Sequence, residues 1–139
     1  MFERCLYFNV NALARQVNTI WDEAFAEFDL SPAHAYLLRL VLAQPGIAQR
    51  DIALELKLEK STVTRFVDAL QNKGLVNRKK TATGDPREQN IFPTAKATKI
   101  AAKLSSKGDE LYKKMLATLG NTDMKTMVEM LRTTAQRLS

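Results

Sequence analysis

The fold of this chain is decided by residues 58–93, which read LEKSTVTRFVDALQNKGLVNRKKTATGDPREQNIFP. In the first half, apolar residues recur every three or four positions, the spacing of one helix face: Val63, Phe66, Val67 and Leu70. Gly74 follows, and glycine is the usual residue just past a helix end because it adopts the left-handed conformation easily. Residues 75–92 then read as strand, turn-rich tip at 83–86, and strand. The stretch predicts a helix joined directly to a β-hairpin.

The opposite face of this helix carries short hydroxyls and long cations: Lys60, Ser61, Thr62, Thr64 and Arg65. Such side chains bond base edges and phosphate oxygens, and arginine binds guanine as a two-donor fork. Further cations are expected to hold the DNA backbone: Lys60 and Lys73 on the helix, and Arg78, Lys79 and Lys80 on the first strand. A solvated polar helix face is the alternative interpretation.

The hairpin tip carries a second candidate contact. Arg87 is suited to a narrow minor groove, whose enhanced negative potential attracts arginine. Asp85, two residues earlier, is placed to pair with Arg87 and fix its direction before binding. The alternative is a plain turn at residues 84–86, which gives Arg87 no role.

The charge of the chain is concentrated in the same region. Net charge is +6; residues 49–99 hold eleven basic and six acidic side chains, whereas residues 1–48 hold three basic and five acidic ones. A polyanion is therefore the expected partner. A basic surface that only aids solubility accounts for the total charge but not for its location.

Residues 61–78, STVTRFVDALQNKGLVNR, and residues 84–94, GDPREQNIFPT, resemble the recognition helix and wing of the MarR family. These are small dimeric winged helix-turn-helix transcription regulators of bacteria and archaea, and the Asp-x-Arg of the wing is the most family-specific part. The resemblance implies a mainly α fold with a small β-hairpin wing, formed as a single domain by residues 1–139. It also implies that Arg87 enters the minor groove, and that base and phosphate contacts come from Ser61, Thr62, Thr64 and Arg65.

The rest of the chain predicts further helices and one strand. Helices are expected at about 3–28, 32–43, 50–56, 94–119 and 124–138, with a short strand at 47–49 and a break at 120–123. The pair 50–56 and 60–73, separated by a tight turn, is the helix-turn-helix arrangement. By the resemblance, about 3–28 and 94–138 are dimerisation helices, and about 30–93 form the DNA-binding part. A helical bundle within one chain is the alternative.

The resemblance further implies a homodimer on a near-palindromic double-stranded operator, acting as a repressor released by a small ligand or an oxidant. A small aromatic or other apolar effector is expected in a pocket near Trp21, His34, Tyr36 and Arg39, although each is more often a core or surface residue. Cys5, the single cysteine, is a candidate redox sensor. The alternative for Cys5 is a small buried hydrophobic residue.

Several functional classes are not expected from this sequence. It lacks a phosphate-cradling glycine loop and recognisable catalytic or metal-binding motifs, so an enzyme, a cofactor and a metal site are not predicted. No apolar run approaches the roughly 20 residues that cross a bilayer, and no secretory signal is recognisable, so a cytoplasmic location is the default. The alternative function is a winged module for protein–protein contact without DNA specificity.

Overall fold

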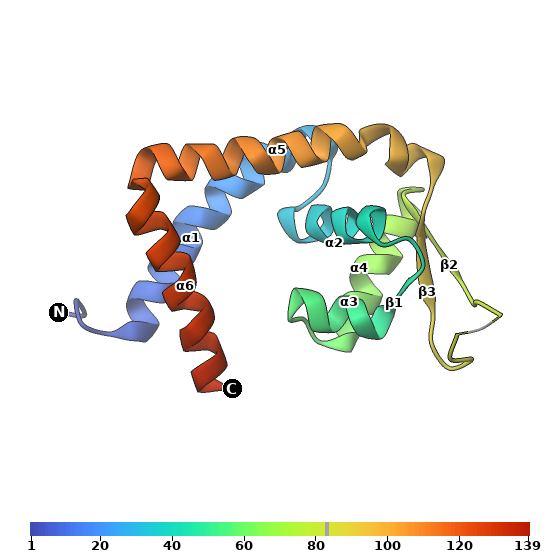
Figure 1. The fold of residues 1–139 in the computed structure, drawn as a ribbon, viewed down its shortest axis with the longest axis horizontal. Helices are drawn as coiled ribbons and strands as arrows, with labels where there is room; N and C mark the ends of the chain where they lie inside the picture. Colours follow the sequence, from blue (N-terminus) through green and yellow to red (C-terminus); the bar gives the residue numbers. More distant parts are fainter. Residues whose placement is uncertain (83) are drawn as a thin grey trace. The chain divides into compact units, whose positions relative to one another are not determined.

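A computed structural model describes residues 1–82 and 84–139 of the chain (Figure 1). Its elements, in chain order, are helix α1 (Leu6–Phe25), the 3₁₀ turn η1 (Ala26–Phe28), α2 (Pro32–Ala43), strand β1 (Ile47–Ala48), α3 (Gln49–Leu56), α4 (Lys60–Asn72), β2 (Val76–Lys79), β3 (Asn90–Pro93), α5 (Ala95–Leu119) and α6 (Asn121–Leu138). The predicted fold class, mainly α with a small β-hairpin wing, is confirmed. None of the helices in the described residues is long and apolar enough to span a membrane.

The chain divides into two compact units, residues 1–105 and 106–139. In the first unit, the three strands form an antiparallel sheet in the order β1-β3-β2. Val76 pairs with Pro93 and Lys79 with Asn90, so β2 and β3 form the arms of the wing. Ile47 pairs with Ile91, which places the start of α3 beside the wing.

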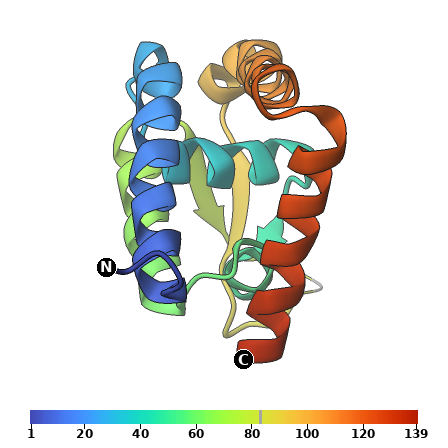
Figure 2. The ribbon, with the colours of Figure 1, turned by 90° about the vertical axis from the view of Figure 1, so that its left-hand side faces the viewer.

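The core of the first unit lies between α2, α4 and the sheet. Figure 2 shows α2 crossing the sheet, which it contacts through β3. The largest fully buried apolar side chains come from every element of this unit except β1 and η1: Phe25, Leu37, Leu38, Val41, Ile52, Val63, Val67, Leu70, Val76, Ile91 and Leu104. Burying one such side chain contributes about 1.5–3 kcal/mol, so this core holds α4 and the wing in place.

Several predicted helix ends are confirmed by their caps. The Ser31 hydroxyl accepts a hydrogen bond from the His34 amide at the start of α2. The Thr94 hydroxyl accepts one from the Ala97 amide at the start of α5. Gly74 has φ +73° just after α4, as predicted for a glycine that ends a helix.

Other predicted boundaries were wrong. Helix α1 begins at Leu6 and not at residue 3, because Cys5 is its N-cap and its Sγ accepts a hydrogen bond from the Phe8 amide at 3.5 Å. Helix α6 begins at Asn121, because Gly120 with φ +89° makes the break alone. Gln49 opens α3 and does not extend β1.

Candidate nucleic-acid interface

Helices α3 and α4 form a helix-turn-helix. The turn is made by Lys57, whose φ of +56° is left-handed, followed by Glu59 at the N-cap of α4. The Glu59 side chain makes no capping hydrogen bond there, in line with its being a less suitable cap. Val63, Val67 and Leu70 of α4 are buried, whereas the predicted contact residues are exposed apart from half-buried Thr62: Lys60, Ser61, Thr64 and Arg65. Helix α4 therefore presents its hydroxyl and cationic side chains to solvent.

Hydrogen bonds within the protein order part of this polar face. The Thr64 hydroxyl donates to the Lys60 carbonyl at 3.1 Å and accepts from Gln49 Nε2 at 3.3 Å. Arg65 has a single long contact, from its Nη2 to the Thr62 hydroxyl at 3.4 Å. A guanidinium has five N–H donors in a planar fork, so Arg65 keeps most of its donors for a ligand.

Arg78 has partners that the sequence analysis did not foresee. Its Nε donates to Gln49 Oε1 at 3.0 Å, its Nη1 to Gln71 Oε1 at 2.8 Å, and its Nη2 to the Thr64 carbonyl at 3.1 Å. The same Nη2 lies 2.6 Å from Asp68 Oδ1, and only 21% of the side chain is exposed. This guanidinium ties β2 to α3 and α4, so the predicted phosphate contact by Arg78 would have to compete with these bonds.

Lys73 is also engaged within the protein. Its Nζ donates to the Asp29 carbonyl and lies 3.5 Å from Asp29 Oδ2. Lys73 is the C-cap residue of α4, so these bonds join the end of that helix to the segment between α1 and α2. The predicted phosphate contact by Lys73 would have to compete with these bonds.

The two lysines after Arg78 have looser partners. Lys79 Nζ lies 5.5 Å from the centre of the Phe92 ring, a cation–π distance. Lys80 Nζ donates to the Pro86 carbonyl at 2.8 Å across the wing. Both side chains are exposed, so they keep donors for an anion.

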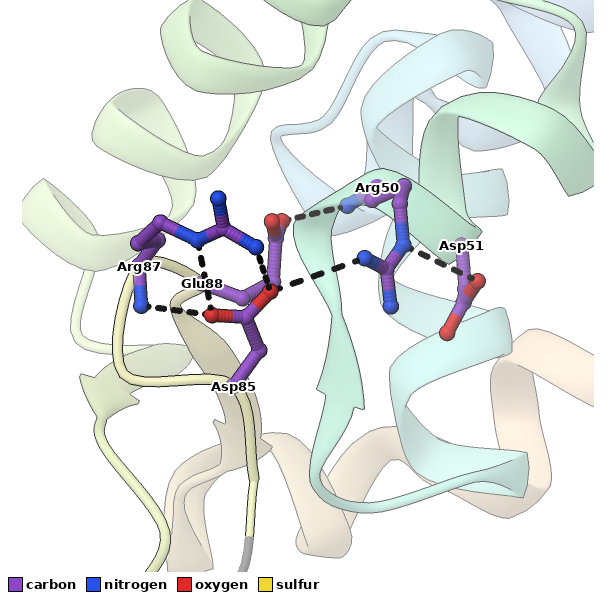
Figure 3. Close-up of polar contacts among 5 residues, drawn as sticks. All are labelled: Arg50, Asp51, Asp85, Arg87 and Glu88. Carbon is purple, nitrogen blue, oxygen red and sulfur yellow. Dashed lines mark hydrogen bonds and ion pairs between the residues drawn. The ribbon is translucent and has the colours of Figure 1, made fainter.

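Asp85 and Arg87 pair at the wing tip as predicted (Figure 3). Asp85 Oδ1 accepts from the Arg87 amide at 2.9 Å and from its Nε at 3.2 Å, and Oδ2 accepts from Nη2 at 3.3 Å. The hydrogen bond from the Arg87 side chain is the main reason why the pKa of Asp85 lies below its ordinary value. The Arg87 side chain is 88% exposed, so the carboxylate orients the guanidinium without enclosing it. Thr83, at the predicted tip, lies outside the described residues.

Sequence reasoning missed two residues at the base of the wing. The Arg50 amide, in the first turn of α3, has no acceptor within the helix and donates to Glu88 Oε1 at 2.9 Å (Figure 3). Arg50 Nη1 also lies 3.9 Å from Asp85 Oδ2, and its Nε lies 3.9 Å from Asp51 Oδ1. No local spacing rule connects residues 38 positions apart, so the charges of Arg50 and Glu88 were the only signal in the sequence.

The predicted pocket residues are distributed over two cavities in the first unit. Trp21 and Tyr36 line a cavity of about 320 Å³, and Trp21 Nε1 donates to the Tyr36 hydroxyl at 3.1 Å. Tyr36 is 40% exposed. Arg39 lies over the Tyr36 ring at 5.2 Å and lines a second cavity, of about 530 Å³, on which Tyr36 also borders.

His34 lines neither of these two cavities. Its ring packs edge-on against Phe66 of α4, with centroids 4.6 Å apart. Burial lowers the pKa of His34, and the charge of Lys73 lowers it further. The structure therefore places His34 in the contact between α2 and α4.

Comparison with known proteins agrees with this arrangement. Residues 28–87 match the model of the MarR family. The uncharacterized HTH-type transcriptional regulator YybA of Bacillus subtilis (strain 168) is 24% identical over 127 residues, which cover 88% of this chain and 81% of that protein. The S. aureus MepR–DNA complex has a TM-score of 0.86 at 24% identity, covering 99% of this chain and 100% of that chain.

A further solved structure has the same fold. The PcaV transcriptional regulator of Streptomyces coelicolor, in complex with its natural ligand, has a TM-score of 0.86 at 20% identity, covering 100% of this chain and 97% of that chain. At these identities the structural likeness establishes the fold, while residues 28–87 carry the family match. Residues 28–87 match the MarR family, and the comparisons support a DNA-binding transcription regulator with a winged helix-turn-helix.

Proposed function

We propose that this chain is a homodimeric repressor that binds a near-palindromic operator and leaves it when a small ligand binds. One observation carries the proposal: two exposed arginine-bearing elements, the polar face of α4 and the wing tip, belong to one unit whose polar network joins them. One element suits the major groove and the other the minor groove. MepR, which shares the fold, has been solved as a DNA complex.

The proposed DNA contacts follow from the hydrogen-bond donors that each side chain does not use within the protein. Arg65 reads a guanine edge, and its α4 neighbours contact bases, thymine methyl groups and phosphates: Lys60, Ser61, Thr62 and Thr64. Arg87, oriented by Asp85, enters the minor groove beside them. Lys79 and Lys80 neutralise phosphates along the wing. Arg78 and Lys73 act from within the protein, because their donors are already occupied.

The dimer is supported by apolar surface at the two ends of the chain. The exposed apolar side chains of α1 and the residues before it include Phe2, Leu6, Tyr7, Phe8, Val10 and Leu13. None of the residues of α6, all of which the structure describes, is buried, and its exposed apolar residues are Met127, Val128, Met130, Leu131 and Leu138. Large apolar side chains exposed in such number on one helix are typical of an interaction site. A second copy covering both segments accounts for the dimerisation helices at about 3–28 and 94–138.

Effector release is supported by the two cavities beside α2. A volume of about 320 Å³ lies at the lower end of the range for small-molecule sites. It is walled by Trp21, Tyr36 and aliphatic side chains, which suits a small aromatic or other apolar effector, and Arg39 beside Tyr36 suits an acidic group on it. PcaV, of the same fold, has been solved with its natural ligand. A ligand here would bear on α1 and α2 and so change the spacing of the two DNA-binding heads.

An oxidant acting at Cys5 is the second candidate for the releasing signal. The cysteine is free and half-buried at the N-cap of α1, in the segment proposed to form the dimer. A cytoplasmic location is part of the same proposal, since the operator is genomic DNA. The competing function, a winged protein–protein module, leaves the exposed hydroxyl and cationic face of α4 without a role.

A selection experiment tests the proposal. The purified chain is mixed with a random pool of duplexes, and the retained fragments are sequenced and used in gel shifts with wild type, Arg65→Ala and Arg87→Ala. We expect a near-palindromic motif with half-sites about one helical turn apart, and at least about tenfold weaker binding by each variant. Lys125→Ala on α6, with its oligomeric state checked by size-exclusion chromatography, is the matched control for loss of one positive charge. Binding without sequence preference, equal in all four proteins, would favour the protein–protein module.

A further inference from the structure

The N-terminus of α3 is capped by the wing and not by its own N-cap residue. That residue is Ala48, whose methyl side chain accepts no hydrogen bond. The first two amides of the helix are bonded instead by the wing: Gln49 N donates to the Gln89 carbonyl at 3.0 Å, and Arg50 N donates to Glu88 Oε1 at 2.9 Å. Free amides at a helix start need partners, and a carboxylate is also favoured by the helix dipole there.

A second bond between the same two elements runs through the wing carboxylate. Asp85 is shared by two arginines, with Arg87 Nε at 3.2 Å from Oδ1 and Arg50 Nη1 at 3.9 Å from Oδ2 (Figure 3). The charge of Arg50 helps to keep the pKa of Asp85 low, after the two hydrogen bonds from Arg87. The carboxylate that orients the minor-groove arginine is thus itself held from α3.

We infer that Glu88 and Arg50 are positioning residues that fix the wing against α3, and so set where Arg87 enters DNA relative to α4. The inference rests on the proposed DNA-binding function. Its reason is geometric: α3 packs on α4, so a wing tied to the first turn of α3 has a fixed offset from the recognition helix. The β1–β3 pairing and Arg78 hold the base of the wing, whereas the Glu88 and Asp85 contacts hold the part nearer its tip.

A direct phosphate contact by Arg50 is the competing explanation, because 49% of its side chain is exposed. The two explanations differ in what survives the loss of the side chain. A lost phosphate contact weakens binding evenly and lowers the salt slope by about 0.9. A lost positioning bond leaves the α4 contacts in place and removes the ordered contact of the wing.

The test uses two footprints on the duplex that the wild-type chain retains most strongly from a random pool. Dimethyl sulfate reports guanine N7 in the major groove, under α4, and hydroxyl radicals report deoxyriboses at the minor groove, under the wing. At saturating protein, we expect Arg50→Ala and Glu88→Ala to keep the N7 protection and to lose at least half of the hydroxyl-radical protection. Glu88→Gln, which retains an acceptor oxygen for the Arg50 amide, should keep both footprints.

Affinity gives a second measure. Glu88→Ala should bind about tenfold more weakly, as expected for a lost hydrogen bond to a charged group. Arg50→Ala, which loses only the ion pairs of its side chain, should bind about two- to fivefold more weakly. Arg87→Ala should lower the DNA affinity of the wild-type chain about tenfold but that of Arg50→Ala less than about threefold, because Arg87 is no longer oriented towards the minor groove in that background. Glu55→Ala is the matched control, since this exposed carboxylate of α3 has no wing contact among the described residues.

Folding and function failures are separable. Glu88→Ala could unfold at a lower urea concentration than wild type, because it leaves the Arg50 amide without its acceptor. In that case the footprints of Arg50→Ala test the inference, because this variant loses the guanidinium but keeps the bond from its backbone amide to Glu88. Full hydroxyl-radical protection by Arg50→Ala, with a lower salt slope, overturns the inference in favour of a phosphate contact. A wild-type chain that retains no duplex overturns the proposed function, and the inference falls with it.

Discussion

Replacing Arg78 with alanine should lower the free energy of unfolding by about 3 kcal/mol, because the guanidinium holds three elements together. Three of its bonds go to neutral oxygens, on Gln49, Gln71 and the Thr64 carbonyl, and a fourth contact goes to Asp68. A hydrogen bond to a charged group contributes about 1.5–3 kcal/mol. We take less than the sum, since the freed acceptors regain water, and Asp68, which is about half exposed, adds under about 1 kcal/mol.

The assay is urea unfolding at fixed protein concentration, followed by the fluorescence of Trp21 and by circular dichroism. With a slope of about 1.5–2 kcal/mol per molar urea, the midpoint of Arg78→Ala should fall by about 1.5–2 M. Arg78→Lys should lie between the two proteins, because an ammonium keeps the charge but loses the planar fork. Lys80→Ala, which loses one exposed bond to the Pro86 carbonyl, is the control and should shift the midpoint by less than about 0.5 M.

The opposite pattern would refute this reasoning. If Arg78 serves mainly as a phosphate contact, the Arg78→Ala midpoint stays within about 0.3 M of wild type, and the salt slope of DNA binding falls by about 0.9. If Arg78 instead stabilises the fold, the urea midpoint of Arg78→Ala falls. The salt slope of its DNA binding, measured under conditions where the variant is folded, then stays unchanged.

Four further outcomes are expected. Arg65→Lys should weaken binding to the selected duplex by about tenfold while leaving binding to unrelated duplex nearly unchanged, since lysine keeps the charge but not the guanine fork. The pKa of His34 in the folded chain is below its ordinary 6.5, so as pH falls the unfolded chain binds a proton at this residue before the folded chain does. The urea midpoint should therefore fall as pH drops from 7.5 through 6.5, and it should fall less in His34→Gln. Gly74→Ala should cost about 1 kcal/mol in urea unfolding, because its φ is +73°. Cys5→Ser should keep the wild-type midpoint, since serine also caps a helix, and loss of peroxide-induced operator release in this variant would identify Cys5 as the sensor.

Local chemistry explains which parts of the site were predictable from sequence. Asp85 and Arg87 are two residues apart in a turn, so their pairing needs no tertiary information. The faces of α4 follow from a period of 3.6 residues, and Ser31, Gly74 and Thr94 mark helix ends through their own backbone and side-chain preferences. The structure confirms each of these local features, and together they define the winged helix-turn-helix.

The features that were missed depend on how elements pack. Arg78 and Lys79 are adjacent cations on one strand, yet successive strand residues point to opposite faces, so only Arg78 is directed towards α4. Lys73 meets Asp29 across 44 positions of sequence, and Glu88 meets Arg50 across 38. A pattern within one element does not contain such pairs, because it records which residues share a face but not what that face meets.

The same distinction changes the electrostatics of DNA binding. Residues 60–87 contain seven basic side chains, all of which the sequence alone offers to DNA. The structure withdraws Lys73 and Arg78, whose donors already serve protein oxygens and carboxylates. To bind a phosphate, either side chain would first have to break those bonds, whereas Arg65 and Arg87 remain exposed. At about 0.9 per phosphate contact, the two withdrawn cations lower the expected salt slope by about 1.8 for each protomer. The number of counterions released should therefore follow from which cations the fold leaves exposed, and not from the net charge of the chain.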